Sequence, residues 1–166
     1  MTDAPLPLSW DAFALRIDLD HAERIANREL ERRDLPARDI ALTGEGPSIT
    51  ATATVEWQVL AGRVAIDLCD LRLGKRHFGC RIAAVRGPLG LPLPVDLVGS
   101  MAQRFGRGIV RYDPEVNVLL VDLRTILPAG VDLALTEVRV EGRSLVLELA
   151  GGGIDASCIA DLLART

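Results

Sequence analysis

Strict alternation of apolar and polar residues is the strongest pattern in this chain. Between residues 49 and 59 every second position is apolar, and threonine, glutamate and glutamine fill the positions between. A period of two is typical of a strand with one buried and one wet face, as in antiparallel pairing. The face predicted to be buried consists of Ile49, Ala51, Ala53, Val55, Trp57 and Val59.

Other alternating segments predict strands on both sides of this one. Residues 13–19 alternate first. After a predicted tight turn at Ala61-Gly62, apolar positions continue to about residue 73, with a phase shift near Asp70 that a bulge explains. A turn at Gly74-Lys75 and a turn at Glu141-Gly142 separate later strands, and Glu137 marks another phase break. These later strands cover about residues 77–86, 109–110, 116–120, 133–140 and 145–149.

Two segments change to the helical period. The first begins at Asp20, has Glu23 three residues later as in a capping box, and runs to about Arg33. The second runs from about Val95 to Phe105, where Gly106 ends it. Each helix has one apolar face and should lie against something apolar. These faces are Ala22, Ile25, Ala26 and Leu30 in the first helix, and Val95, Val98, Met101, Ala102 and Phe105 in the second.

This order of elements predicts an α+β fold, a long curved antiparallel β-sheet packed against two amphipathic helices. Hairpin turns rather than helical crossovers join the strands, which argues against a doubly wound parallel sheet. Residues 1–12 are expected to form an irregular lead-in, and residues 13–150 a single domain. Residues 151–166 are expected to form a glycine hinge and a short C-terminal helix.

The composition indicates an aliphatic core. Of the 166 residues, 49% are hydrophobic, yet there are two tryptophans, one tyrosine and three phenylalanines. The net charge of −4 leaves no electrostatic footprint for nucleic acid. Lys75 is the one lysine, and the arginines are scattered, which favours a coding bias over a phosphate site.

Three cysteines, an odd number, are unusual for a secreted protein of this size. Residues 1–10 lack the pattern of a signal peptide, and no stretch is long and apolar enough to span a membrane. The expected location is therefore the cytoplasm.

Residues that could carry chemistry are isolated from one another. His21 stands at a predicted helix start, and His77 and Cys80 fall on opposite faces of a predicted strand. Ser100 lacks the flanking glycines of a nucleophile elbow. The sequence therefore predicts no enzyme, metal or cofactor, unless distant residues join His21 or His77 to carboxylates in the fold.

The chain resembles a single module of the tubular lipid-binding (TULIP) superfamily. The resemblance lies in the order of elements from Phe13 to Leu149 and in the ending, where Val121-Asp122-Leu123 and Ile126-Leu127-Pro128 precede the last hairpin. It implies a strongly curved sheet around a helix, with a concave apolar surface that binds lipids without catalysis. No residue-level motif of the family can be carried over.

The two wide aliphatic helix faces leave two interpretations open. Helices and sheet either close into a filled core or leave an apolar slot for a lipid tail. Periodicity cannot separate the two. The first hypothesis for function is a non-enzymatic apolar-ligand (lipid-like) binding domain with a concave aliphatic interior. The alternative is a protein-interaction or self-assembly module with a fully packed core and no ligand, for example a homodimer formed through strand edges. The residues expected to line the slot are Ile25, Val55, Trp57, Ile66, Val98, Met101 and Phe105.

Overall fold

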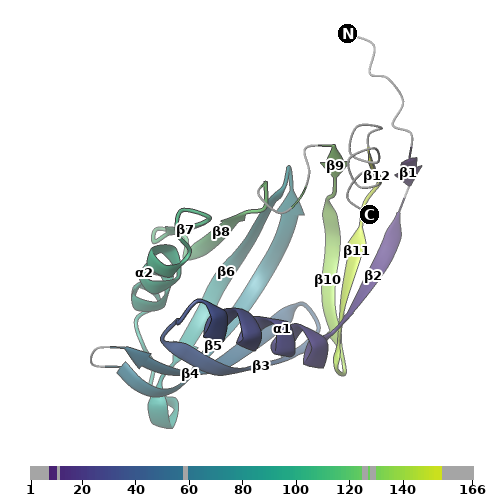
Figure 1. The fold of residues 1–166 in the computed structure, drawn as a ribbon. Coiled ribbons are helices and arrows are strands. Elements are labelled where there is room, and N and C mark those ends of the chain that lie inside the picture. Colours follow the sequence, from purple (N-terminus) through teal and green to yellow (C-terminus); the bar gives the residue numbers. More distant parts are fainter. Residues whose placement is uncertain (1–7, 11, 58–59, 125–126, 128–129, 155–166) are drawn as a thin grey trace.

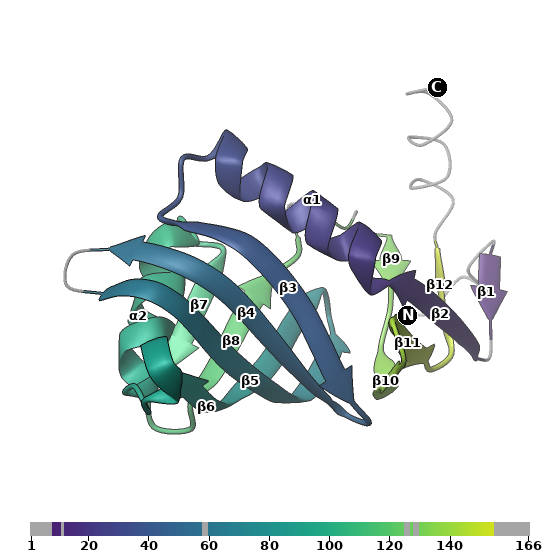
Figure 2. The same ribbon diagram turned by 90° about the horizontal axis from the view of Figure 1, so that it is seen from below.

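A six-stranded antiparallel sheet forms the body of the molecule, and its strand order is β3-β4-β5-β6-β8-β7. The computed structural model describes residues 8–10, 12–57, 60–124, 127 and 130–154. The first four strands in this order are the longest and bend across the molecule (Figure 2). The strands are β3 (Ala37–Glu45), β4 (Ser48–Trp57), β5 (Leu60–Gly74), β6 (His77–Arg86), β7 (Val110–Asp113) and β8 (Val118–Asp122).

Six further strands form two three-stranded sheets, one beside the N-terminal end of the first helix and the other at the far end of that sheet (Figure 1). One contains β10 (Leu135–Glu141), β11 (Ser144–Leu149) and β2 (Phe13–Asp18) in that order. The other contains β1 (Leu8–Trp10), β12 (Gly152–Ile154) and β9 (Val131–Asp132). The sheet that contains β10 meets the large sheet next to the end of β3, where the Val140 N–H donates to the Gly46 carbonyl over 2.7 Å.

Two helices cover the large sheet, as the sequence predicts. Helix α2 (Val95–Phe105) packs on the inner face of the curved sheet, and α1 (Leu19–Arg32) lies along the β3 edge (Figures 1 and 2). The main core, between α2 and the sheet, is built on Val55, Val64, Ile82 and Val85. A second cluster of Leu19, Ile49 and Val140 joins α1, the large sheet and β10. A short 3-10 turn, η1 (Pro88–Gly90), precedes α2. The sheets and the two helices together confirm the predicted α+β class.

Local predictions are confirmed where one pattern decides them. Strand β6 and helix α2 have the predicted bounds. The phase shift near Asp70 is a bulge, because the β5–β6 register shifts between Cys69 and Arg72 and Asp70 has a φ of 52°. A second register shift, between Leu135 and Glu137, accounts for the phase break at Glu137.

Two local predictions are wrong. Ala61 and Gly62 pair with Glu56 and Val55 inside the β4–β5 ladder, so the predicted turn at Ala61-Gly62 is not there. Helix α1 begins one residue before Asp20: Asp18 is its N-cap, and the Asp18 Oδ1 accepts the His21 N–H over 2.7 Å. Strand pairing overrides the turn signal in the first case, and Asp18 takes the capping role in place of Asp20 in the second.

Both ends of the described chain are paired in the smallest sheet. Strand β12 pairs with β1 and β9, where the sequence predicts a hinge and an irregular lead-in. Glycine can join such a ladder because backbone hydrogen bonds do not need a side chain. The C-terminal helix expected over residues 155–164 lies outside the described residues.

Candidate functional site

An apolar cavity of about 360 Å³ lies between the two helices and the inner face of the large sheet. Its volume falls at the lower end of the range for small-molecule pockets. Strands β3, β4 and β5 form its floor, and side chains of α1 and α2 form its walls. The lining residues are Leu30, Ala37, Ile40, Ala51, Thr52, Ala53, Val55, Val64, Ile66, Val98, Met101, Ala102 and Phe105.

Small side chains explain why this space stays open. Ala51 and Ala53 lie on β4, opposite the α2 residue Ala102, and Ala37 lies on β3. Larger side chains such as Met101 and Phe105 border the space but do not fill it. An apolar cavity of this kind holds water poorly, because water needs two to four polar partners.

Five of the seven residues expected to line the slot are brought together here. Val55, Ile66, Val98, Met101 and Phe105 all border the cavity. The other two residues do not contribute to it in the same way. Ile25 is 50% exposed and lies outside the lining, and nothing is described for the Trp57 side chain.

The sequence prediction named five of the large lining residues and missed three others, Leu30, Ile40 and Val64, together with all the small ones. Ala51 and Ala53 are in the alternating face of β4, and Ala102 is in the stripe of α2, so the pattern placed them on buried faces. A run of alanines opposite a helix stripe with Ala102 was the available signal for a gap. Ala37 and Ile40 gave no signal, because β3 follows a weak pattern that ends at a bulge between Arg38 and Ala41.

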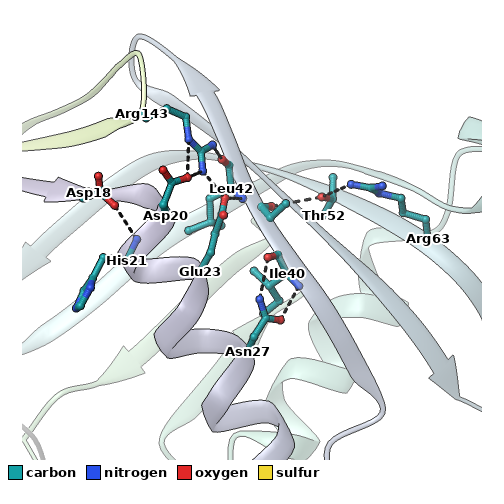
Figure 3. Close-up of polar contacts among 11 residues, drawn as sticks. Asp18, Asp20, His21, Glu23, Asn27, Ile40, Leu42, Thr52, Arg63 and Arg143 are labelled. Carbon is teal, nitrogen blue, oxygen red and sulfur yellow. Dashed lines mark hydrogen bonds and ion pairs between the residues drawn. The ribbon is translucent and has the colours of Figure 1, made fainter.

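Helix α1 is held in place by polar side chains that complete the β3 edge (Figure 3). The Asn27 Nδ2 donates to the Ile40 carbonyl over 3.0 Å, and the Asn27 Oδ1 accepts the Ile40 N–H over 2.7 Å. Two residues along the strand, the Leu42 N–H donates to Glu23 Oε1 over 2.6 Å. The Arg143 Nη1 donates to the Leu42 carbonyl over 2.6 Å. These groups supply the hydrogen bonds that a neighbouring strand would otherwise provide.

Charges reinforce the same contact. Arg143, in the β10–β11 turn, forms ion pairs with Asp20 and, at 2.8 Å, with Glu23. Two hydrogen bonds lower the pKa of the Glu23 carboxyl below its usual value of 4.5. The one from the Leu42 N–H has the larger effect, and the one from the Arg143 guanidinium has the next largest. Glu23 is therefore ionised at neutral pH and ties α1, β3 and the β10–β11 hairpin together.

Helix α2 is fixed against β7 on the other side of the cavity. The Tyr112 hydroxyl contacts Asp96 Oδ1 at 2.7 Å and Asn117 Oδ1 at 2.9 Å, and the Tyr112 N–H donates to Gln103 Oε1 over 3.0 Å. Burial and the Asp96 carboxylate raise the pKa of Tyr112 to about 12, so its hydroxyl stays protonated. The two helices that form the cavity walls are thus anchored at the two edges of the large sheet, α1 at β3 and α2 at β7.

The histidines and the buried thiol lie away from this cavity. His21 is exposed beside Arg24, and the His77 Nδ1 is 2.9 Å from the Lys75 carbonyl. Cys80 is 4% exposed, and burial raises the pKa of its thiol to about 11, which disfavours the reactive thiolate. Across the described ranges, no three His, Cys, Asp or Glu residues are grouped so as to hold a metal.

No helix in the described part of the chain combines the length and hydropathy needed to cross a bilayer. Comparison of the chain with protein-family models, with curated proteins and with solved structures found no match. The resemblance to the tubular lipid-binding superfamily therefore stays a prediction.

Proposed function

We propose that this protein binds an apolar or lipid-like ligand without chemical conversion, in the cavity between α1, α2 and β3–β5. The observation that carries the proposal is the cavity itself, about 360 Å³ with an aliphatic and aromatic lining. Burial of apolar ligand surface there supplies the affinity, at roughly 25 cal/mol for each Å² removed from water. The absence of directional polar groups in most of the lining favours a ligand selected by shape and apolarity.

The test is binding of Nile red, a neutral dye that fluoresces in apolar surroundings, to the protein and to Met101→Trp. Indole at position 101 projects into the cavity and takes up ligand space, so Met101→Trp should weaken dye binding at least tenfold. Leu91→Trp is the matched control, because Leu91 is 61% exposed and outside the cavity. Circular dichroism verifies that both variants are folded. Dye binding that is equal in all three proteins would contradict the proposal.

The alternative is a protein-interaction surface, and one observation favours it. Phe13 and Leu15 on β2 are 40% and 44% exposed, which is high for large apolar side chains on one strand face. Pairing along the β3 edge is disfavoured, because Glu23, Asn27 and Arg143 occupy its outward groups. If sedimentation at high concentration shows only monomer, the hypothesis of self-association through β2 is contradicted.

A further inference from the structure

A second hollow, of about 370 Å³, lies beside the cavity where α1 ends. Four apolar residues border both spaces: Leu30, Ile40, Ala102 and Phe105. The cavity and the hollow therefore adjoin each other along these four residues. The hollow differs in one respect, since Glu29 and Arg33 of the α1 end also line it.

Positively charged groups outnumber negatively charged ones beside this hollow. The Glu29 Oε2 accepts from Arg32 Nη2 over 2.8 Å and from Arg33 Nε over 3.3 Å, so one carboxylate serves two guanidinium groups. Arg32 and Arg33 together lower the pKa of Glu29, which is ionised at neutral pH. The group of three side chains therefore carries a net positive charge.

The Arg33 guanidinium has hydrogen-bond donors that remain available to a ligand. Its Nε is directed to Glu29, and within the described ranges neither of its Nη atoms has a hydrogen-bond partner. Guanidinium donors in a planar fork match the two oxygens of a carboxylate or phosphate. A cationic head group would find no comparable partner, because the Glu29 carboxylate is already paired with two arginines.

We infer that the ligand is a single-chain amphiphile with an anionic head group, its tail in the cavity and its head on Arg33 in the adjoining hollow. The inference rests on the proposed function and adds the class of ligand and its orientation. The tail lies against the shared lining residues Leu30, Ile40, Ala102 and Phe105, and the head stays at the water-facing end of α1. A single chain is inferred because the cavity that would hold the tail is at the lower end of the size range for small-molecule pockets.

The experiment compares three probes with the same tail: laurate, dodecyl phosphate and dodecanol. Each displaces Nile red from the unmodified protein, from Arg33→Gln and from Arg28→Gln at low ionic strength. Arg28 is the matched control, because it is an exposed arginine of the same helix and lies outside both spaces. We expect the better anionic probe to bind roughly three- to tenfold more tightly than dodecanol, since Arg33 is partly exposed and its charge is screened.

Arg33→Gln should remove this preference and leave the affinity for dodecanol unchanged, whereas Arg28→Gln should keep the preference. The tighter of the two anions identifies a carboxylate or a phosphate as the head group. Equal affinity for all three probes, or a preference that survives Arg33→Gln, overturns the inference while the cavity still binds apolar ligands. If neither the dye nor any probe binds, the proposed function fails as well.

Discussion

Single polar side chains decide how α1 is seated. Asn27 uses both ends of its amide on one residue of β3, Ile40, and so acts as a short replacement for a neighbouring strand. Glu23 does the same for the Leu42 N–H and also meets Arg143. A buried or half-buried backbone group left without a partner costs about 1–3 kcal/mol. These residues therefore help to fix the position of α1, alongside its apolar face.

Glu23 should make stability depend on pH. Its pKa is below the usual 4.5 in the fold, so the ionised form stabilises the native state above that value. This contribution is lost as the pH falls through the lowered pKa. Glu23→Gln should be less stable at neutral pH and should lose less stability on acidification to about pH 3. Urea unfolding at both pH values measures the difference, and Glu31→Gln, an exposed change on the same helix, should follow the unmodified protein.

At the scale of the element, α2 approaches β7 closely because residue 99 has no side chain. A Cβ built at Gly99 would lie 2.5 Å from three ring atoms of Tyr112. The ring cannot simply move away, since its hydroxyl is held by Asp96 and Asn117. Glycine costs helix stability, and here the close packing of helix on strand compensates for that cost.

Gly99→Ala should therefore destabilise the protein although alanine favours helix. The gain in helix propensity is at most about 1 kcal/mol, and the forced shift of Tyr112 costs about 1–3 kcal/mol. Ser100→Ala, at an exposed position on the same helix, gives the propensity change without the clash. Thermal unfolding of both variants checks the prediction; a Gly99→Ala variant as stable as Ser100→Ala would mean that the helix shifts freely on β7.

The sequence predicts elements well where one face is wet and one is buried. Strand β6, helix α2 and the bulge at Asp70 follow from periodicity alone. It cannot predict how strands are divided among sheets. One long sheet was predicted, whereas the last hairpin pairs with β2 in a separate three-stranded sheet. That choice depends on pairing between distant segments, such as Leu147 of β11 with Leu15 of β2.

The candidate site was predictable to the same extent. The stripe of α2 and the inner face of β4 gave Val98, Met101, Phe105 and Val55 because those faces had to be buried. Ile25 belongs to the apolar pattern of α1 but is half exposed, since α1 leans on the β3 edge through Asn27 and Glu23. Periodicity identifies a buried face, and packing alone decides whether that face is filled or hollow.

For the whole molecule, the arrangement is a curved sheet with a guarded edge and an open interior. The β3 edge is occupied by α1 and Arg143, and on β7 the outward Tyr112 N–H is bonded to Gln103. Such edges do not invite further strands. Interior space, by contrast, lowers stability because the lining side chains lose contacts with one another. A cavity kept at this cost is what the proposed ligand-binding function would require.

Filling the cavity should therefore raise stability and weaken ligand binding at the same time. Ala53→Val adds two methyl groups to the floor of the cavity, on a strand that accepts a β-branched residue. We expect a gain of about 1 kcal/mol in the free energy of unfolding, from burial of about one to two methyl groups, and weaker Nile red fluorescence. Ala65→Val on β5 is the control, since it makes the same change on a neighbouring strand outside the cavity.

Urea unfolding and dye titration on the three proteins distinguish a ligand site in the cavity from a core that is already filled at Ala53. Ala65→Val should leave dye binding unchanged and report the strand propensity of valine alone. If Ala53→Val instead destabilises the protein, the space at Ala53 is too small for two methyl groups and the core is already filled there. If it stabilises the protein without affecting the dye, the cavity exists but the dye binds elsewhere. A stability gain coupled to a loss of binding is the result that a ligand site inside the fold requires.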